Sequence, residues 1–146
     1  MFDLTGKNAV ITGSSKGIGK SIAMAMAMQG ANVVISSRKV DVCEATAEEI
    51  NNLDTEGAGK AIVIPCNISD KTALEMLVEE TRSQLGQIDI LVCNAATNPY
   101  LGSSKDSSDD AFEKIMNNNI KSNHNICQMV IPEMMDRKDG SIIIVS

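Results

Sequence analysis

The sequence has few aromatic and few basic residues. It holds no Trp, one Tyr and two Phe in 146 residues, and its 13 Lys and Arg are outnumbered by 19 Asp and Glu, which gives a net charge of −6. Proteins that bind nucleic acids usually present a basic surface and aromatic rings on which bases stack. We therefore expect no nucleic-acid partner.

Long hydrophobic runs are also missing. No apolar stretch approaches the length of a membrane-spanning helix, and residues 1–7 are too short and too polar for a signal peptide. Apolar residues still make up 43% of the chain, which excludes a disordered protein and suffices for one domain with a core. We expect a single globular domain over residues 1–146, located in the cytoplasm and without membrane contact.

The cysteines are few and far apart, and there is one histidine. Cys43, Cys66, Cys93 and Cys127 form neither a C-x-x-C metal pair nor the closely spaced set of a disulfide framework. His124 has no candidate partner for a catalytic triad or a metal site near it in sequence. We expect buried free thiols, a surface histidine and no metal centre.

The most informative stretch is a glycine-rich turn, Thr12-Gly13-Ser14-Ser15-Lys16-Gly17-Ile18-Gly19. The apolar run 8–11 before it is typical of a short buried strand, and Ile18, Ile22 and Met26 recur every four residues, as on one face of a helix. Glycines at a strand-to-helix junction leave backbone N–H groups and the positive helix end free to hold a phosphate. The turn therefore predicts a phosphate-binding site.

Three interpretations of this turn are open at this point. The spacing G-x-x-x-G-x-G suits a dinucleotide site, whereas residues 14–21 read S-x-x-x-x-G-K-S, in which Lys20 and Ser21 would bind phosphate and magnesium as in a P-loop. Against a P-loop, Ser14 stands where glycine is usual, and no strand ends in an Asp that would serve the metal. A plain helix cap, with glycines for tight packing, is the third interpretation.

Strands and helices alternate along the rest of the chain. The expected strands are 8–11, 32–36, 61–64, 88–93 and 140–146, and the expected helices run from 18, over 41–53, from 69 or 70 to 86, and over 108–137. Gly30 is expected to cap the first helix, and Pro132 to kink or break the last one. The βαβ alternation predicts an α/β fold with a parallel sheet and a ligand at the carboxyl ends of its strands.

The glycine spacing, with Thr12, Ile18 and the segment Asn94-Ala95-Ala96, resembles the short-chain dehydrogenase/reductase family. That family carries Asn-Ala-Gly or Asn-Ala-Ala at this strand end, where small residues let the backbone approach the cofactor ribose. The resemblance covers the whole chain but only the amino-terminal part of a typical member. It implies a Rossmann-like, doubly wound parallel sheet of five strands in the order 3-2-1-4-5, forming one NAD(P)-binding domain that lacks the family's carboxy-terminal catalytic and substrate segment.

The end of the second predicted strand indicates which dinucleotide is preferred. An NAD-preferring protein usually offers an Asp or Glu to the ribose hydroxyls there, but this chain has Ser37, Arg38 and Lys39, and Lys16 adds a cation nearby. A guanidinium can form paired charge-assisted bonds with a 2′-phosphate, which favours NADP(H) over NAD(H). The alternative is a pair of solvated surface cations.

The resemblance also assigns residues around the adenine ring. The family usually has an Asp where this chain has Asn67, and an amide there can still donate and accept hydrogen bonds. The residues assigned to the cofactor are Gly13, Ser15, Lys16, Gly17, Ile18, Gly19, Ser37, Arg38, Asn67, Ile68, Asn94, Ala95 and Ala96.

The resemblance implies hydride transfer between nicotinamide and a ketone, aldehyde or alcohol, and the run 94–100 is most similar to NADPH-dependent carbonyl reductases. The family's catalytic Tyr has a Lys four positions later, so Tyr100, which is followed by Ser104, is not that residue. The catalytic Ser, Tyr and Lys are expected beyond residue 146, and the chain alone is predicted to be inactive. Asn119 aligns with the family's catalytic Asn, which helps to hold a water that links the Lys to solvent.

Two classes of function stay open. The first is an oxidoreductase represented by an incomplete chain, whose full-length form takes a small carbonyl or alcohol substrate. The second is a nucleotide-binding module that ends at residue 146 and does no catalysis. In the order 3-2-1-4-5, residues 142–145 would form an exposed apolar sheet edge, so we expect a homo-oligomer that associates through this edge or through the long helix beside it.

Overall fold

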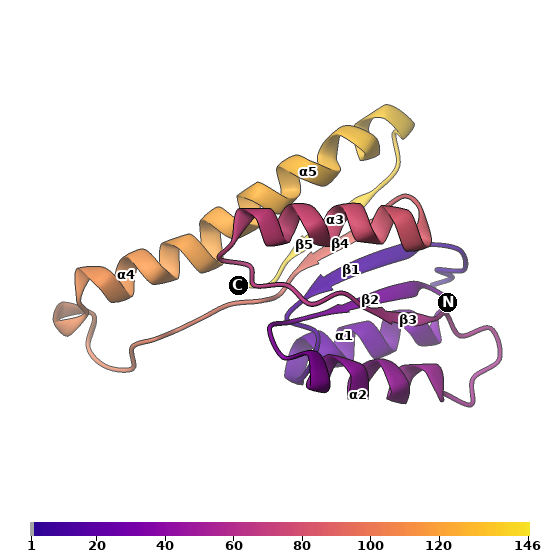
Figure 1. Cartoon of the computed structure of the whole chain (residues 1–146), viewed down its shortest axis with the longest axis horizontal. Coiled ribbons are helices and arrows are strands. Elements are labelled where there is room, and N and C mark those ends of the chain that lie inside the picture. Colours follow the sequence, from indigo (N-terminus) through magenta and orange to yellow (C-terminus); the bar gives the residue numbers. More distant parts are fainter. Residues whose placement is uncertain (1) are drawn as a thin grey trace.

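The computed structural model describes residues 2–146 and shows a five-stranded parallel sheet with helices on both faces (Figure 1). The strands are β1 (Asn8–Thr12), β2 (Asn32–Ser36), β3 (Ala61–Val63), β4 (Ile90–Cys93) and β5 (Ser141–Ile144). They lie in the order β3-β2-β1-β4-β5, which confirms the predicted Rossmann-like topology. The chain changes direction across the sheet between β1 and β4, and ligands of such sheets bind at the carboxyl ends of these two strands.

The helices form two layers. Figure 1 shows α1 (Gly17–Met28) and α2 (Val40–Asn51) on one face of the sheet, and α3 (Lys71–Leu85) and α5 (Ser122–Arg137) on the other. A short helix, α4 (Asp109–Ile115), projects away from the sheet at the end of a long extended segment. Within residues 2–146, no helix combines the length and the apolarity that crossing a membrane would require.

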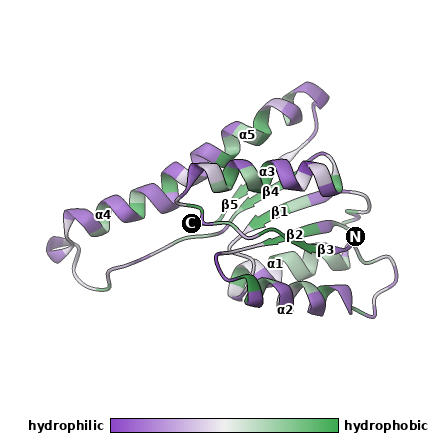
Figure 2. Ribbon diagram, viewed as in Figure 1, coloured by the Kyte–Doolittle hydropathy of each residue, from purple (hydrophilic) through white to green (hydrophobic). Residues whose placement is uncertain are grey.

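Each face of the sheet carries its own hydrophobic core. Alternate residues of β1 point to opposite faces, so that Ala9 and Ile11 pack with α1 and α2, and Val10 packs with α3 and α5. Figure 2 shows the hydrophobic strands between helices whose outer faces are hydrophilic. Burial on both faces explains why the strands read as continuous apolar runs rather than as alternating ones.

The apolar face predicted for α1 is present in part. Ile22 and Met26 are partly buried and pack against the core, whereas Ile18 is 65% exposed. The fully buried residues of α1 are the small ones, Gly19, Ala23 and Ala27, which let the helix approach the strands closely. Gly30, with φ +96°, directly follows Gln29 and ends the helix as the glycine of a Schellman motif: its N–H donates to the Ala27 carbonyl at 2.9 Å, and the Ala31 N–H donates to the Met26 carbonyl at 3.1 Å. The predicted glycine cap is therefore confirmed.

The last helical region is interrupted earlier than predicted. Residues 116–121 form a π-helical segment between α4 and α5, while Pro132 lies inside α5 on its exposed side, where water can reach the carbonyl that loses its hydrogen bond. A side chain one turn later bonds to a backbone carbonyl of the π-helical segment: Asn123 Nδ2 donates to the Asn119 carbonyl at 2.8 Å. Of the two outcomes predicted for Pro132, a kink or a break, the break is therefore absent, and the run of Asn residues marks the irregular turn.

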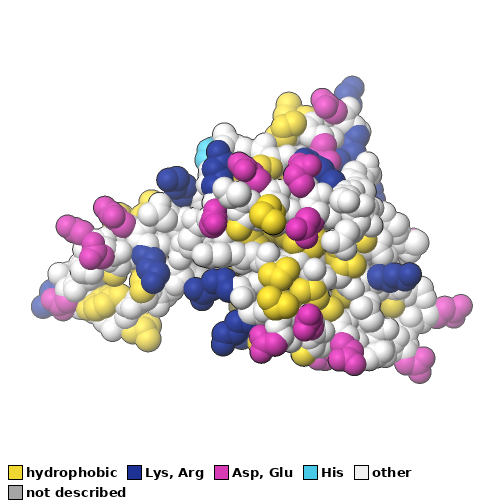
Figure 3. Space-filling view, in the orientation of Figure 1, with side chains coloured by type: hydrophobic (Ala, Val, Ile, Leu, Met, Phe, Trp, Pro, Cys, Tyr) yellow, Lys and Arg dark blue, Asp and Glu magenta, His cyan; other side chains and the backbone are white. Residues whose placement is uncertain are grey.

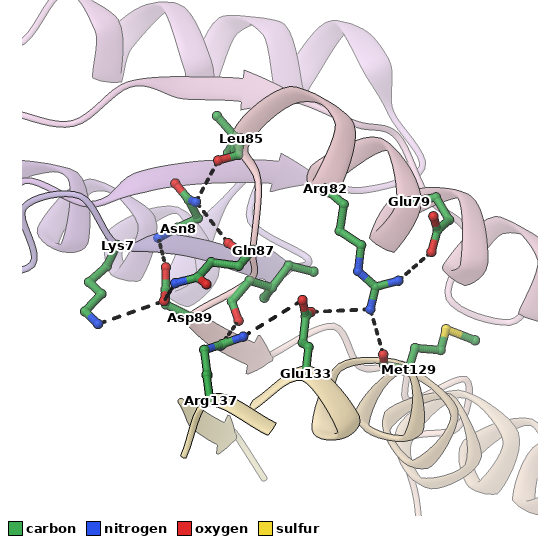
Figure 4. A network of polar contacts seen from close by, with 11 residues as sticks. Lys7, Asn8, Glu79, Arg82, Leu85, Gln87, Asp89, Met129, Glu133 and Arg137 are labelled. Carbon is green, nitrogen blue, oxygen red and sulfur yellow. Dashed lines mark hydrogen bonds and ion pairs between the residues drawn. The ribbon is translucent and has the colours of Figure 1, made fainter. Parts of the chain in front are cut away.

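A network of polar contacts lies at the amino ends of the central strands (Figure 4). Asp89 is buried, and its carboxylate accepts from the Asn8 amide at 2.9 Å and from Gln87 Nε2 at 2.9 Å. Lys7 lies 3.9 Å from the same carboxylate and also pairs with Asp139 at 2.7 Å. These contacts join β1 to the start of β4 and to the turn before β5, far from the carboxyl ends where the site lies.

Candidate functional site

A cleft of about 680 Å³ opens at the carboxyl ends of the central strands. All the residues assigned to the cofactor line it except Ile18 and Gly19. The complete lining is Gly13, Ser15, Lys16, Gly17, Ser37, Arg38, Cys66, Asn67, Ile68, Ser69, Asn94, Ala95, Ala96, Thr97, Pro99, Lys114 and Asn118. Parallel strands bring these segments together because their carboxyl ends share one edge of the sheet.

The three glycines of the turn have different roles. Gly13 has φ +68°, and a Cβ there would lie 2.8 Å from the Cα of Ala95. A Cβ on Gly19 would collide with the Gly13 carbonyl and the Asn94 amide, so Gly19 permits the tight start of α1. Gly17 has φ +57° but only open space beside it. The turn is thus packed tightly against β4 on one side and open toward the cleft on the other.

Ser14 fixes the turn to the neighbouring strand. Its fully buried hydroxyl donates to the Ile11 carbonyl at 2.7 Å and accepts from the Ser36 amide at 2.9 Å. The Ser14 amide also donates to the Ser36 carbonyl at 3.1 Å. These bonds hold the end of β2, and with it Ser37 and Arg38, at a set position beside the glycine turn.

Thr12 and Asn94 fix the turn to β4. The Thr12 hydroxyl accepts from the amides of Asn94 and Ala95, both at 3.0 Å. The Asn94 side-chain amide in turn donates to the carbonyls of Thr12 and Gly13, both at 3.1 Å. Because the side-chain amide of Asn94 donates to these two backbone carbonyls, we infer that its main role is to fix the shape of the cleft.

Three cations at the cleft are available for an anion. Lys16, Arg38 and Lys114 are exposed and line the cleft, and none of them forms an ion pair with a carboxylate among residues 2–146. Figure 3 shows Lys and Arg side chains beside the hollow between the α4 arm and the body of the molecule. In a chain of net charge −6, this local excess of positive charge suits a phosphorylated ligand.

The side chains required by a P-loop are engaged elsewhere. Lys20 pairs with Glu49 of α2, and the Ser21 hydroxyl donates to the Gly17 carbonyl at 3.2 Å. Neither residue lines the cleft. The geometry therefore favours the dinucleotide interpretation of the turn over the P-loop interpretation.

Asn119 does not line the cleft but contacts the segment that leads away from it. Its Oδ1 accepts from the Thr97 amide at 2.8 Å and its Nδ2 donates to the Thr97 carbonyl at 3.0 Å. The π-helical segment presents this side chain to the extended segment that follows β4. Asn119 thus anchors the backbone that continues from the cleft-lining residues Asn94–Ala96.

Several cleft residues were missed at the sequence level: Cys66, Ser69, Thr97, Pro99, Lys114 and Asn118. Thr97 and Pro99 follow the Asn-Ala-Ala segment directly, so the strand-end rule could have included them. Lys114 and Asn118 come from a helical region whose placement depends on tertiary packing, and no local pattern marks them.

The cleft thiol is not poised for nucleophilic chemistry. Burial raises the pKa of the Cys66 thiol to about 11, so it stays protonated near neutral pH. Cys93, at the end of β4, is also buried, and burial together with the neighbouring Cys127 raises its pKa to about 12. The expected buried thiols are present at Cys43, Cys66 and Cys93, whereas Cys127 is half-buried.

Comparison with known proteins gives one consistent family. The short chain dehydrogenase family profile matches residues 7–146. The chain is 37% identical over 143 residues to Dehydrogenase/reductase SDR family member 4 of Sus scrofa, an alignment that covers 98% of this chain and 50% of that protein. It is 38% identical over 144 residues to the human protein named Dehydrogenase/reductase SDR family member 2, mitochondrial, with 98% and 49% covered. The chain spans about half the length of the curated relatives it matches.

Solved structures of similar proteins include two with bound nicotinamide cofactors. A metagenomic short-chain oxidoreductase in complex with NADP shares 29% identity at a TM-score of 0.89, with 98% of this chain and 63% of that chain covered. A 7α-hydroxysteroid dehydrogenase complexed with NADH and 7-oxo glycochenodeoxycholic acid shares 34% identity at a TM-score of 0.90, with 100% and 57% covered. The same fold therefore holds either dinucleotide.

Proposed function

Because this chain belongs to the short-chain dehydrogenase family, we propose that it forms the NADP(H)-binding part of an oxidoreductase. The full protein transfers hydride between the nicotinamide and a ketone, aldehyde or alcohol. The observation that carries the proposal is the single cleft in which the glycine turn, the end of β2 and the Asn-Ala-Ala segment meet. Among oxidoreductases of this kind we favour the carbonyl reductase branch, on the run 94–100.

The cleft has the features that a dinucleotide needs. The open space beside Gly17 admits a pyrophosphate near the amino end of α1, where backbone N–H groups and the helix dipole favour negative charge. Where the turn approaches Ala95, Gly13 adds no side-chain atom of its own to the cleft, and the side chain of Ala95 is a single methyl group. Bound here, the dinucleotide supplies the hydride donor or acceptor, and the protein orients it.

The preference for NADP(H) rests on Lys16 and Arg38. Both cations are exposed in the cleft, and Arg38 stands where an acidic residue would hold the ribose hydroxyls of NAD. A 2′-phosphate would form charge-assisted hydrogen bonds with the Arg38 guanidinium, whereas a ribose hydroxyl is uncharged and would form a weaker hydrogen bond with it. The bound NADP of one similar structure supports this choice, and the NADH of the other shows that the family does not dictate it.

Equilibrium titration tests this proposal. The chain has no Trp, so binding of NADPH is followed by the fluorescence of the reduced nicotinamide itself, with MgATP titrated in competition. We expect NADPH to bind and MgATP to displace it poorly. Tighter binding of MgATP than of NADPH would contradict the proposal.

Catalysis needs groups that residues 1–146 do not provide. Tyr100, the only tyrosine, is followed by Ser104 rather than Lys four positions later, so the chain offers no Tyr and Lys pair of the family type. We place these groups in the remainder of a longer protein and expect residues 1–146 alone to bind cofactor without turnover. Asn119 contributes by positioning, because it anchors the Thr97 backbone beside the cleft.

Residues 1–146 self-associate in this proposal. The outer edge of β5 has no strand partner among residues 2–146, and Ile143 and Ile144 are 44% and 57% exposed. An unpaired apolar strand can pair with an identical strand of a second copy.

For the cellular compartment we propose the cytoplasm. One relative is named as mitochondrial, and fractionation of cells expressing the tagged protein decides between the two.

A further inference from the structure

The base of a dinucleotide bound in this cleft would lie over the end of β3. In a doubly wound sheet the pyrophosphate sits at the first helix and the adenosine ribose at the end of the second strand. Here those positions are Gly17 and Arg38, so the base extends beyond them to Asn67, Ile68 and Ser69, which follow β3 and line the same cleft. This placement rests on the function proposed above.

Asn118 faces this region from the opposite side. It belongs to the π-helical segment, lines the cleft, and is only 9% exposed. Its Oδ1 accepts a hydrogen bond of 2.7 Å from the Ser69 hydroxyl. Its Nδ2 has no hydrogen-bond partner among residues 2–146, although this atom is not sealed from solvent. An amide nitrogen that bonds to no protein atom can donate its hydrogens to a ligand or to water.

The same amide also borders a second cavity of about 740 Å³, which lies between the start of α3 and the helical arm. Ile68, Ser69, Lys114 and Asn118 line both spaces. Since the Ser69 hydroxyl holds the carbonyl side of the Asn118 amide, the amide hydrogens are the part left for a ligand.

We propose that Asn118 is a specificity residue that reads the purine base of the bound dinucleotide. Its Nδ2–H group donates a hydrogen bond to one ring nitrogen of adenine, and Ser69 positions the amide for this contact. Adenine offers N1, N3 and N7 as acceptors in its ring, whereas a pyrimidine base at the same place would present a different edge. In this way a hydrogen-bond donor on the π-helical segment, Asn118 Nδ2, makes the cleft selective for a purine base.

Purine analogues test this contact in the unmodified chain. We would measure dissociation constants for adenosine 2′,5′-bisphosphate and for its 1-deaza, 3-deaza and 7-deaza counterparts, in each of which one ring nitrogen is replaced by C–H. One analogue should bind roughly threefold to tenfold more weakly than the parent, the loss expected for one hydrogen bond. Equal binding of all four ligands would overturn the proposal.

Variants identify the donor. In Asn118→Leu, which keeps the side-chain volume but removes the donor, the penalty of that one analogue should disappear. In Asn117→Leu, a matched change on a residue that lines only the second cavity, it should persist. Ser69→Ala removes the hydrogen bond that holds the Asn118 amide, so it should reduce the penalty of that analogue. This variant provides the test if Asn118→Leu does not fold. A penalty unchanged in both Asn118→Leu and Ser69→Ala would overturn the proposal.

This outcome is separable from that of the proposed function. If the unmodified chain binds neither NADPH nor adenosine 2′,5′-bisphosphate, the cofactor assignment itself fails. If both bind and no deaza analogue is penalised, the cofactor assignment stands and only the role of Asn118 is wrong.

Discussion

Gly13 and Gly17 stand in one turn, yet their substitution would have different consequences. Both adopt positive φ, which strains any residue with a Cβ, but only Gly13 is also in close contact with the backbone of Ala95. Gly57 provides a comparison, because it has φ +78°, no atom within 4 Å of the position that a Cβ would occupy, and a loop position outside the cleft.

We predict that Gly13→Ala lowers the free energy of unfolding more than Gly57→Ala does. Both changes carry the strain of positive φ, about 1–2 kcal/mol, and only Gly13→Ala adds the collision with Ala95, whose Cα would lie 2.8 Å from the new Cβ. Urea unfolding followed by circular dichroism measures the difference. Equal losses would show that the contact between the turn and β4 is less tight than described.

The buried thiols give the molecule a pH dependence. Burial raises the pKa of Cys66 to about 11, and burial with the nearby Cys127 raises that of Cys93 to about 12, against 9.0 for a free thiol. The folded state therefore keeps protons that the unfolded state releases. This contribution to stability is complete below pH 9 and is lost as the pH rises toward the folded values.

We therefore predict that the free energy of unfolding falls between about pH 8.5 and pH 10.5 more steeply in the parent chain than in a Cys66→Ala/Cys93→Ala variant. Comparison of the two slopes removes the effect of lysines, which titrate in the same range. Urea unfolding at several pH values provides the data, and parallel slopes would refute the assignment to these thiols.

Among the elements, the π-helical segment Met116–Lys121 has the clearest link to the cleft. It presents Asn119 to Thr97 and Asn118 to Ser69, so that a helix far along the chain positions segments that follow β4 and β3. Loss of either amide should loosen one of these segments without removing the helix.

Replacing Asn119 by Ala should raise the hydrogen exchange rate of the Thr97 amide, because that amide donates to Asn119 Oδ1 at 2.8 Å. Asn117→Ala is the control, since its side chain forms no hydrogen bond among residues 2–146 and lies outside the cleft. Exchange measured by NMR resolves the single amide. Unchanged protection at Thr97 would mean that other contacts hold this segment.

The sequence predicted these elements with uneven success. The alternation of strands and helices, and the α3 stop at Gly86, follow from local chemistry and are present in the structure. The helix does not break at Pro132, because a proline on the exposed side of a helix is tolerated. Of the apolar face predicted for α1, Ile22 and Met26 pack against the core but Ile18 does not, and the fully buried positions are Gly and Ala. Neither outcome is visible before the neighbours of the helix are known.

At the scale of the whole molecule, strand order explains why the cleft forms. Residues from three distant parts of the sequence, at Gly13, Arg38 and Asn94, gather there because β2, β1 and β4 are neighbours and end at the same edge. The strand ends could be predicted from the sequence. Lys114 and Asn118 could not, because they reach the cleft only through the packing of the helical arm.

The free edge of β5 predicts the behaviour of the chain in solution. Ile144→Lys should shift residues 1–146 toward the monomer, because a charged side chain on an edge strand opposes pairing with a second copy. The matched change on a helix, Met76→Lys, alters an equally exposed apolar residue away from the edge and should leave association unchanged. Light scattering across a concentration series gives the masses. A monomeric parent chain at high concentration would contradict the proposed self-association.

The proposed preference for NADP(H) depends above all on Arg38 at the end of β2. The most direct measurement is the ratio of the dissociation constants for NADH and NADPH in the parent chain, in Arg38→Ala and in Lys39→Ala, which removes the adjacent cation that does not line the cleft. We predict tighter binding of NADPH by the parent, a preference reduced roughly tenfold or more in Arg38→Ala, and a preference kept in Lys39→Ala. Equal affinities of the parent for the two dinucleotides, or equal effects of the two substitutions, would contradict the proposed role of Arg38.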